Sequence, residues 1–163
     1  ESGALERVGR GLYALKGADF SEHHSLVQAV RRVPKAAICL LSALRFHDLT
    51  SQNPHEVWIA IGPKDRLPQV NQPPLQVVRF GAGHFDLGLE THEVEGARLR
   101  VYSVARTVVD LFRYRNKIGL DVALEALREG WRERRFTLAE INRIAGGCRM
   151  ARVMKPYLES LTA

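Results

Sequence analysis

The spacing of apolar residues changes twice along the chain, from helical to strand-like near residue 56 and back to helical near residue 103. In the first section, apolar residues recur at helical spacing over Lys35–His47, which predicts a helix there. A shorter helix is expected before it, because Ser25-Leu-Val-Gln28 has the spacing of a capping box. Pro34 should end that first helix, since the residue before a proline avoids the helical region.

The middle section has the short apolar runs that are typical of strands. The residues Glu95-Gly96 favour a tight turn between two of these runs, so a hairpin is expected around them. Gly62–Pro74 is rich in proline and is expected to form an irregular loop. The four predicted strands are Glu56–Ile61, Leu75–Phe80, Gly88–Val94 and Ala97–Ser103.

The remainder of the chain is expected to be helical. Ser103 is a plausible N-cap for a helix over Val104–Tyr114, and Thr137-Leu-Ala-Glu140 has capping-box spacing. Further apolar stripes at helical spacing run through Leu120–Trp131 and Met150–Leu161. Pro156 should bend the last of these helices or start it afresh. The pattern predicts an α+β fold, a mixed domain of about four strands and several helices with a helical C-terminal part.

Composition fits one globular domain, because 45% of the 163 residues are apolar and 26% are charged. The formal net charge is +6 and it is unevenly distributed. Residues 1–97 carry 10 basic and 11 acidic side chains, whereas residues 98–163 carry 14 basic and 7 acidic ones. The excess suggests a polyanionic or acidic partner.

Several classes of protein are not supported. The two cysteines, Cys39 and Cys148, cannot form a disulfide framework, so a reducing, cytoplasmic location is expected. The longest apolar stretch, Ala36–Leu44, is about half as long as a membrane span, and no signal peptide is recognisable. The chain begins at Glu1 without an initiator Met, which suggests that a segment precedes it.

No catalytic or metal-binding motif is evident. None of the six histidines pairs with a cysteine or another histidine at zinc-ligand spacing, and His84-Phe-Asp86 is the nearest candidate. There is no nucleophile elbow, phosphate-binding loop or dinucleotide fingerprint. Asp86 and Glu90 lack the lysine that a nuclease would place near them along a strand. We therefore expect no metal, no cofactor and no enzymatic activity.

The N-terminal residues suggest contact with nucleic acid. Apolar runs flank Gly9-Arg10-Gly11, a glycine turn that predicts a hairpin over Leu5–Leu15. Arginines at the tip of an exposed hairpin reach phosphates or a narrow minor groove, although any hairpin can carry two arginines. The candidate DNA-binding residues are Arg7, Arg10, Gly11, Tyr13 and Lys16.

Basic residues also gather in the helical section. Arg106 and Asp110 lie one helical turn apart beside Ser103, as either a simple ion pair or a buried polar cluster that marks a ligand or partner site. Two further groups of basic residues are either solvated helix faces or binding patches. One closes the helix that follows Ser103, and the other surrounds Trp131 on the next helix. The possible basic partner surface comprises Arg106, Arg113, Arg115, Lys117, Arg132, Arg134 and Arg135.

Four stretches of the chain resemble the AbiEi-like antitoxins, which are the transcriptional regulators of bacterial type IV abortive-infection toxin–antitoxin systems. The first, Leu5-Glu-Arg-Val-Gly-Arg-Gly-Leu-Tyr13, resembles the wing that ends the N-terminal winged helix-turn-helix of that family. The other three are Cys39–Leu49, Glu56–Ile61 and Val101–Gly119, and the resemblance covers most of residues 4–130.

The resemblance implies a protein of two parts. Residues 1–20 would be the remnant wing hairpin of the winged-helix domain, and residues 21–163 a C-terminal α+β antitoxin domain. The family represses its own operon by binding promoter DNA, and it counters a nucleotidyltransferase-like toxin without being an enzyme. The upstream recognition helix expected in the family is not in this sequence, so direct readout of bases by this chain is in doubt.

Two alternatives remain open at the level of the sequence. One is an orphan regulator or protein-interaction module without a toxin partner. The other, less favoured, is a nucleic-acid-processing enzyme that would use Asp86 or Glu90. The sequence does not predict the oligomeric state.

Overall fold

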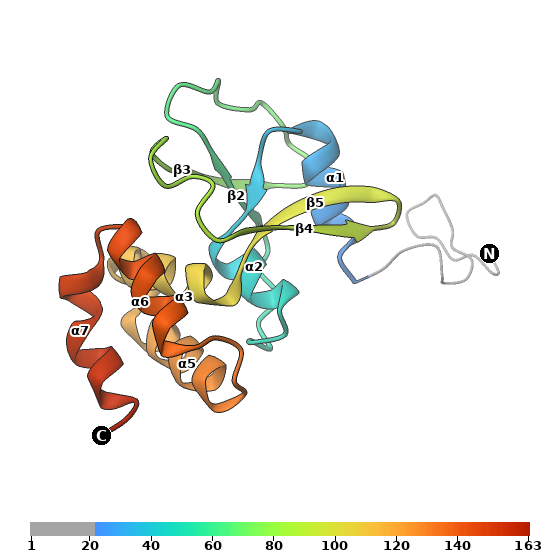
Figure 1. The fold of residues 1–163 in the computed structure, drawn as a ribbon. Helices are drawn as coiled ribbons and strands as arrows, with labels where there is room; N and C mark the ends of the chain where they lie inside the picture. Colours follow the sequence, from blue (N-terminus) through green and yellow to red (C-terminus); the bar gives the residue numbers. More distant parts are fainter. Residues whose placement is uncertain (1–21) are drawn as a thin grey trace.

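The computed structural model describes residues 22–163, which form a five-stranded mixed sheet and seven helices (Figure 1). The predicted wing hairpin, and with it Arg7, Arg10, Gly11, Tyr13 and Lys16, lies outside the described residues. Within the described residues the fold is α+β, as the apolar pattern predicts, with one strand more than the four expected.

The strands occupy the first part of the fold and the helices most of the second. The strands are β1 (Ala37–Ile38), β2 (Val57–Ile61), β3 (Leu75–Arg79), β4 (Leu89–Val94) and β5 (Ala97–Tyr102). The helices are α1 (His24–Arg32), α2 (Leu40–Phe46), α3 (Val104–Arg113), α4 (Arg115–Ile118), α5 (Leu120–Arg132), α6 (Leu138–Gly147) and α7 (Ala151–Ser160). The longest helix, α5, has 13 residues, and no helix in residues 22–163 has the length and apolar character to cross a membrane.

The strand order across the sheet is β3-β2-β1-β5-β4. The short strand β1 is central, and it runs antiparallel to β2 and parallel to β5. On either side lie the parallel pair β2–β3 and the antiparallel hairpin β4–β5. The hairpin turns at Glu95-Gly96, where both residues have positive φ angles of 52° and 75°, which suits a tight hairpin turn.

The two faces of the sheet are covered unequally (Figure 1). Along β2, Ile59 and Ile61 point to the face that α1 covers, whereas Trp58 and Ala60 point to the opposite face, because successive strand residues alternate. On that opposite face, residues of α2, α3, α5, α6 and α7 join the same core cluster as Trp58. Among the described residues, α1 is the one helix with most of its buried residues on the other side.

Two local expectations, and one of the two outcomes expected at Pro156, are wrong. The predicted helix over Lys35–His47 begins only at Leu40, because Ala37–Ile38 pair with two strands instead; a short apolar run does not distinguish a buried strand from a buried helix. Ser25 does not cap α1, whose N-cap is His23 without a side-chain hydrogen bond. Pro156 does not start a helix afresh, because α7 begins at Ala151 and continues through it.

The predicted caps of the C-terminal helices are confirmed. The Ser103 hydroxyl accepts a hydrogen bond from the Arg106 backbone N–H at the start of α3. The Thr137 hydroxyl accepts one from the Glu140 backbone N–H at the start of α6. Each cap satisfies a backbone donor that the helix itself leaves unpaired.

Candidate functional site

The buried corner between β5 and α3 holds the ion pair Arg106–Asp110. The Arg106 Nε lies 3.0 Å from each Asp110 carboxylate oxygen, and the two side chains are 0% and 1% exposed. The same guanidinium donates through Nη1 to the carbonyl oxygens of His84 (2.6 Å) and Leu87 (2.7 Å). Arg106 therefore fastens the loop of residues 81–88 to helix α3 as well as neutralising Asp110.

The rest of this corner is built to fit the arginine. The Arg106 guanidinium carbon lies 4.5 Å from the centre of the Tyr102 ring and 4.8 Å from that of Phe80, a cation–π arrangement on both rings. The Tyr102 hydroxyl donates to the Phe85 carbonyl oxygen at 2.6 Å. The Arg106 Nη2 is buried without a hydrogen-bond partner, and the adjacent aromatic rings stabilise its charge instead.

A glycine permits the close approach of the loop to the helix. Gly88 has a φ of +74°, and a Cβ there would lie 2.8 Å from the Arg106 Cβ. Its carbonyl oxygen accepts a hydrogen bond of 2.7 Å from the Ser103 backbone N–H, directly before α3. The corner thus requires a residue without a side chain at position 88.

The electrostatics of the corner follow from burial. Burial raises the pKa of Asp110 to about 6, against the attraction of the Arg106 charge, so the carboxylate is ionised at neutral pH. Burial also raises the pKa of both nearby thiols, Cys39 and Cys148, which keeps them protonated and unreactive. Arg106, Asp110 and the two thiols are buried, whereas His84 and Asp86 of the loop are partly exposed and exposed, respectively.

This corner decides between the two interpretations that the sequence left open for Arg106 and Asp110. They form a buried polar cluster whose partners are a loop and two rings of the same chain. Arg106 is fully buried, so its inclusion in a basic partner surface is wrong. The sequence did not reveal this, because an i, i+4 pair has the same spacing on a buried and on an exposed helical face.

The other predicted basic residues form two separate groups. Arg113 donates to the Cys148 carbonyl oxygen and Arg115 to that of Phe112 (2.7 Å), while the Lys117 Nζ lies 5.7 Å from the centre of the Trp58 ring. This group adjoins the start of α5. The second group lies around the other end of α5, about 20 Å away for a helix of 13 residues, so the two do not make one patch.

The second group is largely neutralised by neighbouring acids. Arg132 pairs with Glu129 and Glu133, and Arg135 lies 3.4 Å from the Glu133 carboxylate. Arg134 is exposed, has a φ of +57° and lies at the turn after α5. Exposed pairs of this kind contribute little to stability, but they reduce the positive field that the sequence alone suggests.

Histidines gather at one edge of the fold, which the sequence did not predict. The Phe46 ring centre lies 4.7 Å from that of His23, 5.3 Å from that of His47 and 4.8 Å from that of His92. His47 Nε2 lies within hydrogen-bond distance, 2.8 Å, of the Tyr102 carbonyl oxygen, and burial lowers the pKa of His47. In residues 22–163 no three potential ligands from His, Cys, Asp and Glu are grouped so that they could hold a metal ion.

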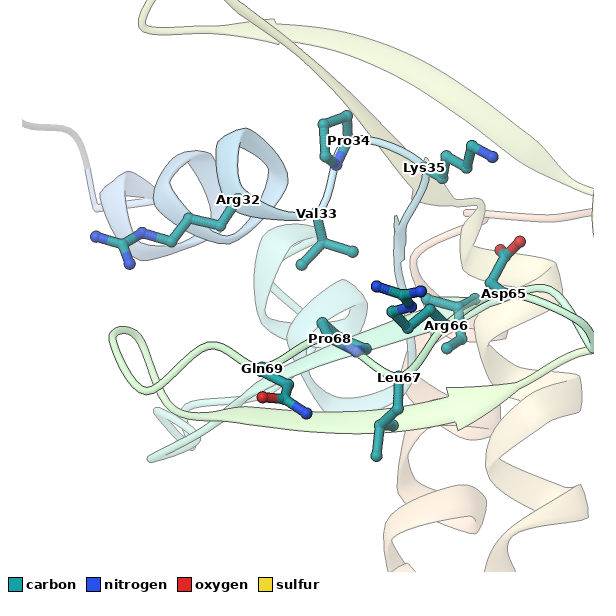
Figure 2. A pocket seen from close by; sticks show the side chains of 10 residues that line it. Arg32, Val33, Pro34, Lys35, Asp65, Arg66, Leu67, Pro68 and Gln69 are labelled. Carbon is teal, nitrogen blue, oxygen red and sulfur yellow. The ribbon is translucent and has the colours of Figure 1, made fainter.

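An open pocket lies where α1 ends, beside the loop between β2 and β3 (Figure 2). We call it the α1-end pocket. Its volume is about 690 Å³, within the range of small-molecule sites. The residues that line it are Arg32, Val33, Pro34, Lys35, Ile61, Asp65, Arg66, Leu67, Pro68 and Gln69.

The sequence did not predict this pocket, because its two walls are distant along the chain. One wall is the turn after α1 and the other is the proline-rich loop, which was expected only to be irregular. The sequence does show cations on both segments, Arg32 and Lys35 on one and Arg66 on the other. It does not show that the two segments are neighbours in the fold.

Comparisons with known proteins do not identify the chain. Neither the search against protein-family models nor the search of curated proteins returned a match. The resemblance to AbiEi-like antitoxins therefore rests on the four sequence stretches themselves.

Proposed function

We propose that this chain is the antitoxin and transcriptional autorepressor of a type IV abortive-infection toxin–antitoxin system, and that it acts without catalysis. One observation carries the proposal: the stretch Val101–Gly119, the longest that resembles the family, makes up the end of β5, all of α3 and α4, and the glycine before α5. The Arg106–Asp110 pair lies at its centre. The resemblance thus concerns residues on which this fold depends, rather than a short surface motif.

In this proposal the two parts of the chain have different tasks. The wing residues Arg7, Arg10, Gly11, Tyr13 and Lys16 contact the sugar-phosphate backbone of promoter DNA, which gives affinity without sequence choice. Residues 21–163 counteract the nucleotidyltransferase-like toxin. The exposed Lys117, together with Arg113 and Arg115, is a basic group within the resembling stretch and adds phosphate contacts.

Growth rescue tests the antitoxin half. The full chain is co-expressed with the toxin encoded beside its gene, and growth arrest is measured. We expect rescue by the wild-type chain and by a variant with all wing cations replaced by Ser, because in this proposal residues 21–163 counteract the toxin without DNA binding. A chain that binds its promoter but leaves growth arrested is an orphan regulator instead.

Promoter binding across a salt series tests the DNA half. Each phosphate contact that a substitution removes reduces the slope of log K against log salt by about 1. We expect Arg7→Ser/Arg10→Ser/Lys16→Ser to flatten the slope, and Arg113→Ser/Arg115→Ser/Lys117→Ser to flatten it less. The control is Arg128→Ser/Arg143→Ser/Arg152→Ser, which removes the same charge from exposed positions on three other helices. Binding that is indifferent to salt, or equal flattening by the control, contradicts the assignment.

A further inference from the structure

The α1-end pocket combines an apolar interior with a cationic rim. Val33 and Pro68, both partly exposed, contribute apolar surface to it, and the lining also includes Leu67, which is 57% exposed, and the buried Ile61. The rim carries Arg32, Lys35 and Arg66. We propose that this pocket binds an extended acidic segment of a protein partner, with an apolar side chain of that segment seated against the interior.

The charge of the rim is not neutralised within the described residues. The side chains of Arg32, Lys35 and Arg66 have no ion pair and no hydrogen bond in residues 22–163, unlike the arginines around α5. The one acid of the lining, Asp65, accepts a hydrogen bond of 2.8 Å from the Gly62 backbone N–H, which partly satisfies it. The pocket therefore presents net positive charge to any ligand.

The position of these cations is not explained by the helix alone. Basic residues are favourable at a helix C-terminus because of the macrodipole, and this accounts for Arg31 and Arg32 in the last turn of α1. It does not account for Lys35, which follows the helix, or for Arg66, which comes from a different segment of the chain. Two segments that are distant along the chain thus place three cations beside one pocket, and this is what indicates a binding site.

Both walls of the pocket are already held in place. Arg79 Nη1 donates to the carbonyl oxygens of Gly62 (3.0 Å), Pro63 (3.3 Å) and Asp65 (2.7 Å), which fixes the loop wall. Arg100 donates to the Lys35 carbonyl oxygen, which fixes the turn after α1. A preformed site binds more tightly than one that must be ordered on binding, because less conformational entropy is lost.

The arrangement of the rim favours a peptide over nucleic acid. In Figure 2 the charged ends of Arg32 and Lys35 point outward on opposite sides of the pocket and Arg66 lies between them, so the three do not converge on a single phosphate. The lining contains no aromatic residue on which a base could stack. An apolar interior with a charged rim is the anatomy of a protein interface, and an acidic segment with spaced carboxylates complements it.

The inference goes beyond the proposed function, because peptide binding is measured without toxin or promoter. The probe is a fluorescent peptide with the repeated sequence Asp-Glu-Leu, titrated with the full chain at low salt and followed by anisotropy. We expect Arg32→Glu/Lys35→Glu/Arg66→Glu to raise Kd at least about tenfold, and Leu67→Ser to raise it about threefold. An Asn-Gln-Leu peptide should bind at least about tenfold more weakly than the acidic one.

The matched control separates the pocket from net charge. Arg128→Glu/Arg143→Glu/Arg152→Glu makes the same change of charge at exposed positions on α5, α6 and α7, and it should change Kd less than about twofold. Equal weakening by both triple variants would mean non-specific attraction and would overturn the proposal. So would a pocket variant that weakens binding of a random DNA duplex while the peptide still binds.

Folding is checked for each variant by circular dichroism. If the charge-reversed pocket variant is unfolded, the neutral variant Lys35→Ser/Arg66→Ser takes its place, with Arg143→Ser/Arg152→Ser as its control. The neutral pocket variant should raise the peptide Kd about fivefold and its control less than about twofold. Absence of peptide binding by the folded wild-type chain also overturns the proposal.

Discussion

Arginine has opposite roles in two regions of this molecule. In the corner between β5 and α3, Arg106 is fully buried, and its partners are a carboxylate, two carbonyl oxygens and two aromatic rings. At the α1-end pocket, Arg32 and Arg66 are exposed and have no charged partner within the described residues. An unpaired exposed cation is thus available to another molecule, whereas a buried one with partners maintains the fold.

Replacing the buried arginine should have the largest effect. Arg106→Met leaves Asp110 buried without its counter-charge and releases the carbonyls of His84 and Leu87. We expect the free energy of unfolding to fall by about 3–5 kcal/mol, measured by urea denaturation. The double variant Arg106→Met/Asp110→Leu should recover part of that loss, because no unpaired charge remains. If Arg106→Met lowered the free energy of unfolding by less than about 1 kcal/mol, the buried arginine would not maintain the fold as proposed.

Gly88, which allows the loop of residues 81–88 to approach α3 closely, provides the next test. Gly88→Ala should destabilise the fold by about 2–4 kcal/mol, because the new Cβ would lie 2.8 Å from the Arg106 Cβ at a positive φ. Gly96→Ala is a matched control, since its φ of +75° is nearly the same and nothing lies within 4 Å of the new Cβ. It should cost only about 1 kcal/mol. Equal losses in thermal unfolding would show that backbone strain alone matters at position 88.

The pH dependence of stability should report Asp110. Because burial raises its pKa from 3.8 to about 6, the folded protein binds this proton more tightly than the unfolded chain does. Its contribution to stability is therefore greatest below about pH 4 and decreases as the pH rises through about 6. Relative to Asp110→Asn, the wild-type chain should lose about 2–3 kcal/mol between about pH 4 and 7. A constant difference between the two chains over this range would contradict the raised pKa.

The smallest effect is expected at the pocket. Arg66→Ser removes an exposed side chain without a partner in residues 22–163, so the free energy of unfolding should change by no more than about 0.5 kcal/mol. Urea denaturation of this variant beside Arg106→Met measures the two arginines on one scale. A loss above about 1 kcal/mol would mean that Arg66 holds the loop, as Arg79 does.

Periodicity predicted four helices and the β4–β5 hairpin, but it did not predict that α3 is buried on nearly every side. The stripes of α3, α5, α6 and α7 and the alternation of the β4–β5 hairpin were visible in the sequence, and Ser103 and Thr137 act as the caps their positions indicate. β1 was missed, because two apolar residues carry no period. Its strand conformation depends on pairing with residues 59, 60 and 101, which local sequence does not encode.

The two candidate sites differ in how much of each could be predicted from the sequence. Arg106 and Asp110 were recognised as a pair, since one helix brings them together, but the burial that defines their role comes from a loop that lies 19 to 22 residues earlier in the chain. The α1-end pocket was not foreseen, because Lys35 and Arg66 meet only through the folding of the sheet. The charge balance of the sequence favoured residues 98–163, where Arg132 and Arg135 in fact have acidic partners.

The two-residue strand β1 also bears on how the chain folds. Without it, the sheet divides into the parallel pair β2–β3 and the hairpin β4–β5, which have no shared hydrogen bonds. Joining them through Ile38 requires contacts with residues 59 and 101, and each contact closes a long loop at a cost in chain entropy. Docking of β1 is therefore the long-range step that turns two halves of the sheet into one cooperative unit, and the amide hydrogens around Ile38 should exchange with solvent only when that unit opens.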